Sequence, residues 1–181
     1  MSQSVDPGVS LAWRFLKYRR LLIISVLVLA ADQATKAWIG AHLPFNTYGE
    51  DGGAITVVRG FFYIVHVGNT GAAWSIFSGR SIFLAALAAG TLVAIFLGRK
   101  ALGLANPQLQ ASFGLICGGI TGNLLDRLTR GHVVDFLDFH FGTYIYPTFN
   151  VADSAICVGV ALYILSSIRA PRPAEKGLTP R

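Results

Sequence analysis

Residues 21–40 read LLIISVLVLAADQATKAWIG, an apolar run long enough to cross a membrane as one helix, and this run decides the fold class. At a rise of 1.5 Å per residue, about 20 apolar residues cover the ~30 Å hydrocarbon core of a bilayer. Three further stretches approach that length, at residues 80–98, 108–128 and 151–169. We therefore expect a mainly α-helical integral membrane protein with four transmembrane helices.

The composition supports a membrane protein. Of the 181 residues, 53% are hydrophobic and only 13% are charged, and the mean hydropathy is +0.55. The net charge of +6 does not indicate nucleic-acid binding, because the basic residues are dispersed between the apolar stretches. The third stretch is the least apolar because glycines dilute it. Small residues let membrane helices pack closely, so we expect it to be the buried helix.

The basic residues predict the orientation. With the N-terminus in the cytoplasm, ten Lys and Arg residues lie inside and four lie outside, which fits the positive-inside rule. The inner set is Arg14, Lys17, Arg19, Arg20, Arg99, Lys100, Arg169, Arg172, Lys176 and Arg181, and the outer set is Arg59, Arg80, Arg127 and Arg130. Both termini are then cytoplasmic.

This topology predicts one membrane domain. It comprises a cytoplasmic N-terminal segment (1–20), helices at 21–40, 80–98, 108–128 and 151–169, outer segments at 41–79 and 129–150, and a disordered cytoplasmic tail (170–181). In the first outer segment, residues 55–67 read ITVVRGFFYIVHV and are rich in β-branched and aromatic side chains. We expect a small β-sheet between the first two helices, with a turn at Arg59 and Gly60. A re-entrant apolar segment is the alternative.

Two aspartates lie near the outer membrane surface. Asp135, in GHVVDF, follows the third apolar stretch, and Asp153, in FNVAD, begins the fourth. Carboxylates at a membrane boundary are costly to keep unless they are used. Facing each other, they could share one proton and activate a water, as in aspartic proteases. Asp138 is a weaker candidate, expected to be solvated.

Helix capping is the competing explanation for Asp153. Asn150 and Asp153 have the spacing of a capping box, and an acid in the first turn of a helix interacts favourably with its dipole. Capping would explain Asp153 alone. It would not explain Asp135, which lies among apolar residues.

Other polar residues gather near the same membrane boundary. Asp32 and Lys36 lie four apart on the first helix, which favours a structural ion pair with Lys36 reaching outward. Asn123, Asp126 and Arg127 project from the outer end of the third helix. Asp126 and Arg127 could merely terminate that helix, or Arg127 could orient a carboxylate or bind a lipid phosphate.

The stretch NTGAAW at 69–74 also has two readings. Asn69 and Gly71 could form a turn, with Trp74 as an interfacial anchor, or Asn69 could point its amide at the reaction centre. Cys117 and Cys157 lie in apolar segments without metal-ligand spacing, so we expect both to be buried and unpaired. The isolated histidines give little support for a metal or haem, and no cofactor is expected.

Five stretches taken together resemble the lipoprotein signal peptidases, also called signal peptidase II. They are DQATK at 32–36, NTGAAW at 69–74, GGITGNLLDR at 118–127, VVDF at 133–136 and FNVAD at 149–153. The resemblance implies a bacterial inner-membrane aspartyl endopeptidase with four helices and an outer β-cradle. Its substrates would be diacylglyceryl-modified prolipoproteins, held among membrane lipids and cut just before the lipidated cysteine.

The resemblance also implies residue roles. Asp135 and Asp153 match the catalytic dyad, and no metal is implied. Supporting positions are matched by Asp32, Lys36, Asn69, Gly71, Asn123, Asp126, Arg127 and Asn150. Of these, Asn123, Asn150 and Arg127 are expected to hold the carboxylates in register. Trp74 stands where Phe is usual, and Ile120 where Ala is usual.

Two other classes of function remain as alternatives. A small transporter or proton carrier could use Asp32, Lys36, Asp126 and Asp153 as a relay between helices. However, the acidic residues cluster at the outer ends of the predicted spans and none lies in an inner half, so a continuous path is missing. A non-enzymatic assembly subunit would use the polar cluster for helix association alone.

Overall fold

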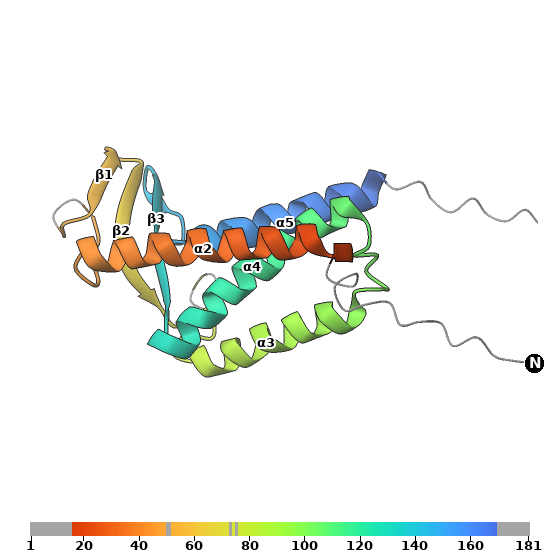
Figure 1. The fold of residues 1–181 in the computed structure, drawn as a ribbon. Helices are drawn as coiled ribbons and strands as arrows, with labels where there is room; N and C mark the ends of the chain where they lie inside the picture. The colour runs from red at the N-terminus through yellow and green to blue at the C-terminus, as the bar shows by residue number, and fades with distance from the viewer. Residues whose placement is uncertain (1–15, 50–51, 73, 75, 170–181) are drawn as a thin grey trace, which may run out of the picture.

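The computed structural model describes residues 16–49, 52–72, 74 and 76–169. Within them, four long helices form a bundle, and a small sheet lies against one end of it (Figure 1). The helices are α2 (Arg19–His42), α3 (Ser81–Gly98), α4 (Pro107–Arg130) and α5 (Val151–Arg169). This arrangement confirms the predicted fold class. The predicted tail, and the N-terminal segment up to residue 15, lie outside the described residues.

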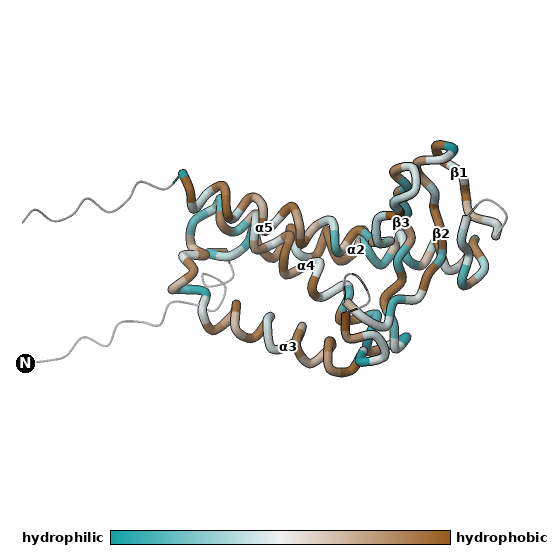
Figure 2. Tube along the Cα trace, turned by 180° about the vertical axis from the view of Figure 1, so that it is seen from behind, coloured by the Kyte–Doolittle hydropathy of each residue, from teal (hydrophilic) through white to brown (hydrophobic). Residues whose placement is uncertain are grey.

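Three of these described helices, α2, α3 and α5, are long and apolar enough to cross a membrane. Hydrophobic residues run along α3 and α5, whereas hydrophilic residues gather where the helices meet the sheet (Figure 2). Helix α4 is less apolar but carries the most buried residues. It packs against α2, α3 and α5, which confirms the prediction that the third helix is the buried one.

Glycines allow this close packing of α4. A Cβ atom at Gly118 would lie 2.8 Å from the carbonyl oxygen of Ser25 on α2. At Gly119 it would lie 2.4 Å from the carbonyl oxygen of Ala152 on α5. Both distances are too short for a side chain, so the small residues bring the backbones of α2 and α5 against α4.

The sheet is antiparallel, with strands in the order β1 (Ile55–Val58), β2 (Phe62–Asn69), β3 (Val133–Phe141) and β4 (Tyr144–Ile145). The turn between β1 and β2 contains Arg59 and Gly60, as predicted, and Gly60 has a φ of +73°. The prediction was wrong in confining the sheet to the segment between the first two helices. Strand β3 comes from the segment that was expected to be an outer loop. The sequence did not predict it because its two aspartates interrupt the apolar alternation that signals a strand.

Two contacts fix β3 relative to the helices. Helix α4 ends at Arg130 and is capped by Gly131, whose φ of +76° lets the chain turn directly into β3. At the end of α2, Ile39 and Leu43 form a buried core with Val134 and Phe136 of β3. Because Asp135 lies between these two core residues, its side chain leaves the opposite face of the strand.

Candidate active site

Asp135 occupies a buried position on β3, with 2% of its surface exposed. The Asn69 side chain donates a hydrogen bond from Nδ2 to Asp135 Oδ2 at 2.9 Å. The Oδ1 atom of Asn69 accepts from the N–H of Gly71 at 2.9 Å, which sets the orientation of the amide. Asn69 therefore forms the predicted turn, and this turn directs its NH₂ group at Asp135.

Asp153 lies in the first turn of α5 and makes the predicted capping box. The Asn150 Oδ1 atom accepts from the N–H of Asp153 at 2.9 Å, and Asp153 Oδ2 accepts from the N–H of Asn150 at 3.2 Å. Capping leaves Oδ1 of Asp153 free for another partner. That oxygen accepts from Nδ2 of Asn123 at 2.7 Å.

Asn150 connects the two aspartates. Its backbone N–H binds Asp153, and its side-chain Nδ2 lies 2.7 Å from Asp135 Oδ1. The same Nδ2 also contacts Asn123 Oδ1 at 3.2 Å and the carbonyl oxygen of Val134 at 3.3 Å. Asn150 is fully buried. One amide residue therefore holds both carboxylates in a single polar network.

Both carboxylates line one cavity of ≈ 350 Å³. Its walls combine the polar side chains of Asn69, Asn123 and Arg127 with apolar groups from α5 and the loop before it. Cys157, one turn beyond Asp153, also lines this cavity and is exposed, so the prediction that both cysteines are buried was wrong. The two cysteines are free, and Cys117 is partly buried.

The electrostatics of the cavity favour a protonated Asp135. Burial, the largest cause, and the neighbouring charge of Asp153 raise the pKa of Asp135, whereas hydrogen bonds from Asn69 and Asn150 and the charge of Lys36 lower it. The net result is a pKa of about 7. Near neutral pH, Asp135 can therefore supply an acidic proton beside a second carboxyl group.

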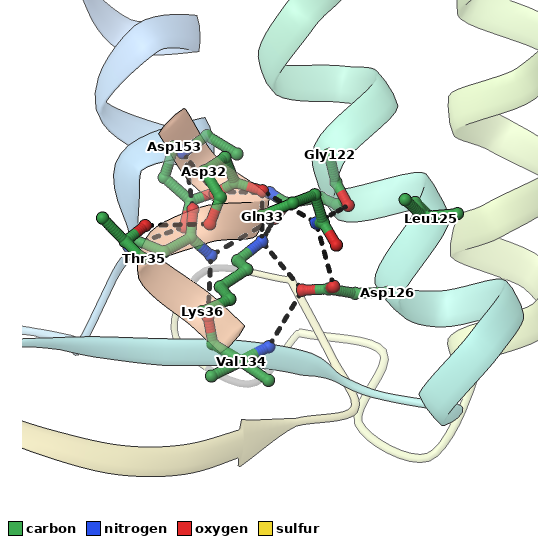
Figure 3. Close-up of polar contacts among 12 residues, drawn as sticks. Asp32, Gln33, Thr35, Lys36, Gly122, Leu125, Asp126, Val134 and Asp153 are labelled. Carbon is green, nitrogen blue, oxygen red and sulfur yellow. Dashed lines mark hydrogen bonds and ion pairs between the residues drawn. The ribbon is translucent and has the colours of Figure 1, made fainter. Parts of the chain in front are cut away.

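Behind the cavity lies a buried ion cluster (Figure 3). Lys36 Nζ lies 2.9 Å from Asp32 Oδ2 and 2.8 Å from Asp126 Oδ2, and all three side chains are inaccessible to solvent. The predicted pair of Asp32 and Lys36 is confirmed, but the expected outward direction of Lys36 is wrong. Lys36 turns inward because Asp126 on α4 offers it a second carboxylate.

Two further residues join this cluster that the sequence did not single out. Gln33 Nε2 donates to Asp32 Oδ2 at 3.1 Å and to Asp126 Oδ1 at 3.2 Å, and Arg130 pairs with Asp126. The four-residue spacing of Asp126 and Arg130 was an available signal for that pair. Asp126 thus does more than terminate α4.

Arg127 differs from its expected role. Its guanidinium donates to the main-chain carbonyls of Asn123, at 3.4 Å, and Gly71, at 3.2 Å. It therefore ties α4 to the segment after β2, where Trp74 is exposed, instead of orienting a carboxylate by a hydrogen bond. Asn123 and Asn150 make the side-chain hydrogen bonds to the two carboxyl groups instead.

Asp138 is buried, with 4% of its surface exposed, so the expectation that it is solvated was wrong. His140 Nε2 lies 2.8 Å from its Oδ2, and Thr148 donates to its Oδ1 at 3.3 Å. It lies three positions after Asp135 on β3, so the two aspartates lie on opposite faces of the strand. In the described part of the chain, no group of three or more His, Cys, Asp or Glu side chains could hold a metal ion.

Two carboxyl groups that share one proton are the working parts of aspartic peptidases. In this chain, two carboxyl groups line one cavity where membrane-type helices meet a small sheet. The fold and the site together define a membrane aspartic peptidase. A family model described as signal peptidase (SPase) II matches residues 24–169, and the chain belongs to this family.

Curated relatives and solved structures agree with this family. The chain is 40% identical over 169 residues to the lipoprotein signal peptidase of Nitratidesulfovibrio vulgaris (strain DP4), covering 90% of this chain and 96% of the relative. It is 43% identical over 151 residues to the lipoprotein signal peptidase of Oleidesulfovibrio alaskensis, covering 80% and 91%. A bacterial membrane enzyme solved by the in meso method at 2.3 Å resolution superposes with a TM-score of 0.73 at 29% identity, covering 86% of this chain and 94% of that structure.

Proposed function

We propose that this enzyme removes signal peptides from diacylglyceryl-modified prolipoproteins, cutting just before the lipidated cysteine with Asp135 and Asp153 as the catalytic dyad. Membership of the signal peptidase II family supports the substrate class. The observation that carries the two-aspartate mechanism is the position of Asn150, which hydrogen-bonds both carboxyl groups at the wall of one cavity.

The mechanism assigns different protonation states to the two aspartates. Asp135, whose pKa lies at about 7, is protonated and donates to the oxygen of the scissile carbonyl. Asp153 is ionised, because the N-terminal end of α5 favours a carboxylate there. It takes a proton from a water, whose oxygen attacks the carbonyl carbon.

Collapse of the resulting gem-diol completes the reaction. The proton on Asp153 passes to the departing nitrogen, and Asp135 recovers its proton from a hydroxyl of the intermediate. The carbon–nitrogen bond breaks, and the dyad returns to its starting protonation state. The amides of Asn69, Asn123 and Asn150 keep both carboxyl groups oriented throughout.

The membrane would deliver the substrate to the cavity. Each buried CH₂ of an acyl chain contributes about 0.8 kcal/mol, so the lipid anchors keep the precursor in the bilayer and reduce binding to a lateral search. The apolar surfaces of α3 and α5 fit a lipid environment, and nucleic acid has no part in this function. The cavity, at the outer ends of the helices, then meets the junction of signal peptide and lipidated cysteine.

The same proposal includes a location and a domain layout. The enzyme spans the bacterial inner membrane four times as a single domain, with both termini in the cytoplasm and the dyad at the periplasmic face. The distribution of basic residues supports this orientation. Arg99 and Lys100, for example, lie in the connection between α3 and α4, at the end of the bundle away from the sheet.

Cleavage of a synthetic lipid-modified precursor by the purified protein tests this proposal. Mass spectrometry should find the released signal peptide with the wild-type protein, and none with Asp135→Asn or Asp153→Asn. Asp138→Asn is the matched control, because it changes a buried aspartate on the same strand outside the cavity. Cleavage by Asp153→Asn would leave that residue with its capping role alone, and a wild-type protein that releases no peptide would favour a transporter or an assembly subunit.

A further inference from the structure

The ion cluster of Asp32, Lys36 and Asp126 is called here the buried triad (Figure 3). None of its residues lines the cavity, yet its carboxylates bind the residues that precede Asp135 and Asp153. The Lys36 ammonium has three hydrogens and three acceptors. They are Asp32 Oδ2 at 2.9 Å, Asp126 Oδ2 at 2.8 Å and Asn123 Oδ1 at 2.9 Å. Charges inside a membrane protein are costly, so a fully buried triad indicates a use.

The two carboxylates of the buried triad also hold backbone groups of other elements. Asp32 Oδ1 accepts from the N–H of Ala152 at 3.0 Å, at the start of α5. Asp126 Oδ2 accepts from the N–H of Val134 at 3.2 Å, on β3. Ala152 immediately precedes Asp153, and Val134 immediately precedes Asp135. Each catalytic aspartate therefore follows a peptide group that one carboxylate of the triad holds.

Lys36 also reaches the dyad through a side chain. Its bond to Asn123 Oδ1 fixes which end of that amide is the oxygen, so the NH₂ group faces Asp153 Oδ1 at 2.7 Å. The same Asn123 oxygen accepts from Asn150. Three chains of contact thus start at one ammonium group: two pass through carboxylates to the backbone, and one passes through an amide to a carboxyl group.

From this geometry we infer that the buried triad sets the distance and orientation between Asp135 and Asp153, with Lys36 as the shared positioning residue. The chain from β3 to α5 runs through β4 and is tied back to β3 by backbone hydrogen bonds between Phe149 and Leu137. Lys36 adds a second tie from the helix side, because it holds together the two carboxylates that bind the N–H groups of Ala152 and Val134. The inference deepens the proposed two-aspartate mechanism and rests on it.

A role in stability alone predicts something different. Removing one partner of a buried ion pair is strongly destabilising, so a triad kept only for folding predicts a lower unfolding midpoint and an unchanged chemical step in the molecules that remain folded. A positioning role predicts loss of kcat in molecules that remain folded. A misplacement of about 1 Å at a reacting group can reduce rate by about 100-fold.

The test is Lys36→Met, which keeps the length of the side chain without its charge. We expect kcat for the lipid-modified precursor to fall by about 100-fold and KM to stay within about threefold, since Lys36 does not touch the cavity. Hydrogen exchange at the amides of Val134 and Ala152 should accelerate.

The matched control is Ser25→Ala, which removes the bond from Ser25 to the Gly114 carbonyl between the same helices, α2 and α4. It should lower the unfolding midpoint without changing kcat or the exchange of either amide.

Lys36→Arg covers the case in which Lys36→Met does not fold. It keeps the positive charge, but a planar guanidinium cannot offer three acceptors the compact donor that an ammonium provides, so kcat should fall by about tenfold in a folded protein. A kcat near the wild-type value in Lys36→Met or Lys36→Arg, or unchanged exchange of both amides, overturns the inference. Faster exchange in a protein whose wild type cleaves nothing would instead retain the positioning geometry and refute the proposed function.

Discussion

Replacing Asn150 with alanine removes the residue that connects Asp135 and Asp153, the proposed catalytic dyad. The substitution takes away the hydrogen bonds of Nδ2 to Asp135 and Asn123, and the bond that Oδ1 accepts from the N–H of Asp153. The backbone N–H of residue 150 can still bind Asp153 Oδ2. Asp135 therefore loses a direct partner, whereas Asp153 keeps its bonds to that N–H and to Asn123.

The magnitude follows from these bonds. Loss of a helix N-cap costs about 1 kcal/mol, and leaving a buried acceptor without its hydrogen-bond partner costs about 1–3 kcal/mol. We expect the unfolding free energy of Asn150→Ala to fall by about 2–4 kcal/mol. The bond from Asn150 lowers the pKa of Asp135, so its removal raises that pKa further above 7. If the bond favours the ionised form by about 1.4 kcal/mol, the alkaline limb of kcat/KM moves up by about one pH unit.

Two measurements check this prediction on the purified variant: the thermal unfolding midpoint in detergent, and kcat/KM for the lipid-modified precursor as a function of pH. Asn106→Ala is the matched control, because Asn106 caps α4 in the same way at the opposite end of the bundle, accepting from the N–H of Gln108 at 2.9 Å. It should lose about 1 kcal/mol of stability and leave the pH profile unchanged. An Asn150→Ala variant with the wild-type pH profile and kcat would refute the connecting role.

Two further predictions concern the wild-type dyad and the glycine packing. Because the raised pKa of Asp135 keeps it protonated below about pH 7, kcat/KM should fall as the pH rises through that value, and a profile flat from about pH 6 to 9 would contradict the assigned proton. Gly119→Ala places a Cβ atom 2.4 Å from the Ala152 carbonyl oxygen and should lower stability by about 1–3 kcal/mol in thermal unfolding. The control Gly90→Ala, on α3, meets nothing within 4 Å and should not destabilise the protein; an equal loss in both variants would refute the packing argument.

Features with a local cause could be predicted from the sequence. Helix α2 follows from one apolar run, and the capping box of Asn150 and Asp153 requires only residues three apart. The pair of Asp32 and Lys36 follows from helical spacing. In each case the interacting groups lie within one or two turns of each other, so the residue pattern already specifies the contact.

Features with distant partners were predicted wrongly or missed. Lys36 was expected to reach outward, but it turns inward to Asp126. Asp126 lies on another helix, so the spacing within the first helix could not indicate this second carboxylate. The burial of Asp138 depends on His140 and Thr148, which come together only when β3 and the following loop fold back. Strand β3 itself forms because β2, more than 60 residues earlier, supplies its hydrogen-bonding edge.

The sequence by itself determined the membrane class and the helices, and it singled out Asp135 and Asp153 as candidates, because apolar length and short motifs are properties of neighbouring residues. Only the tertiary structure decided how those aspartates are held. Asp32 reaches the N–H of Ala152 across 120 positions of sequence, and Asn69 reaches Asp135 across 66. Such bonds form because buried polar groups must find partners wherever the packed helices and sheet offer them. The dyad acquires its geometry from that requirement.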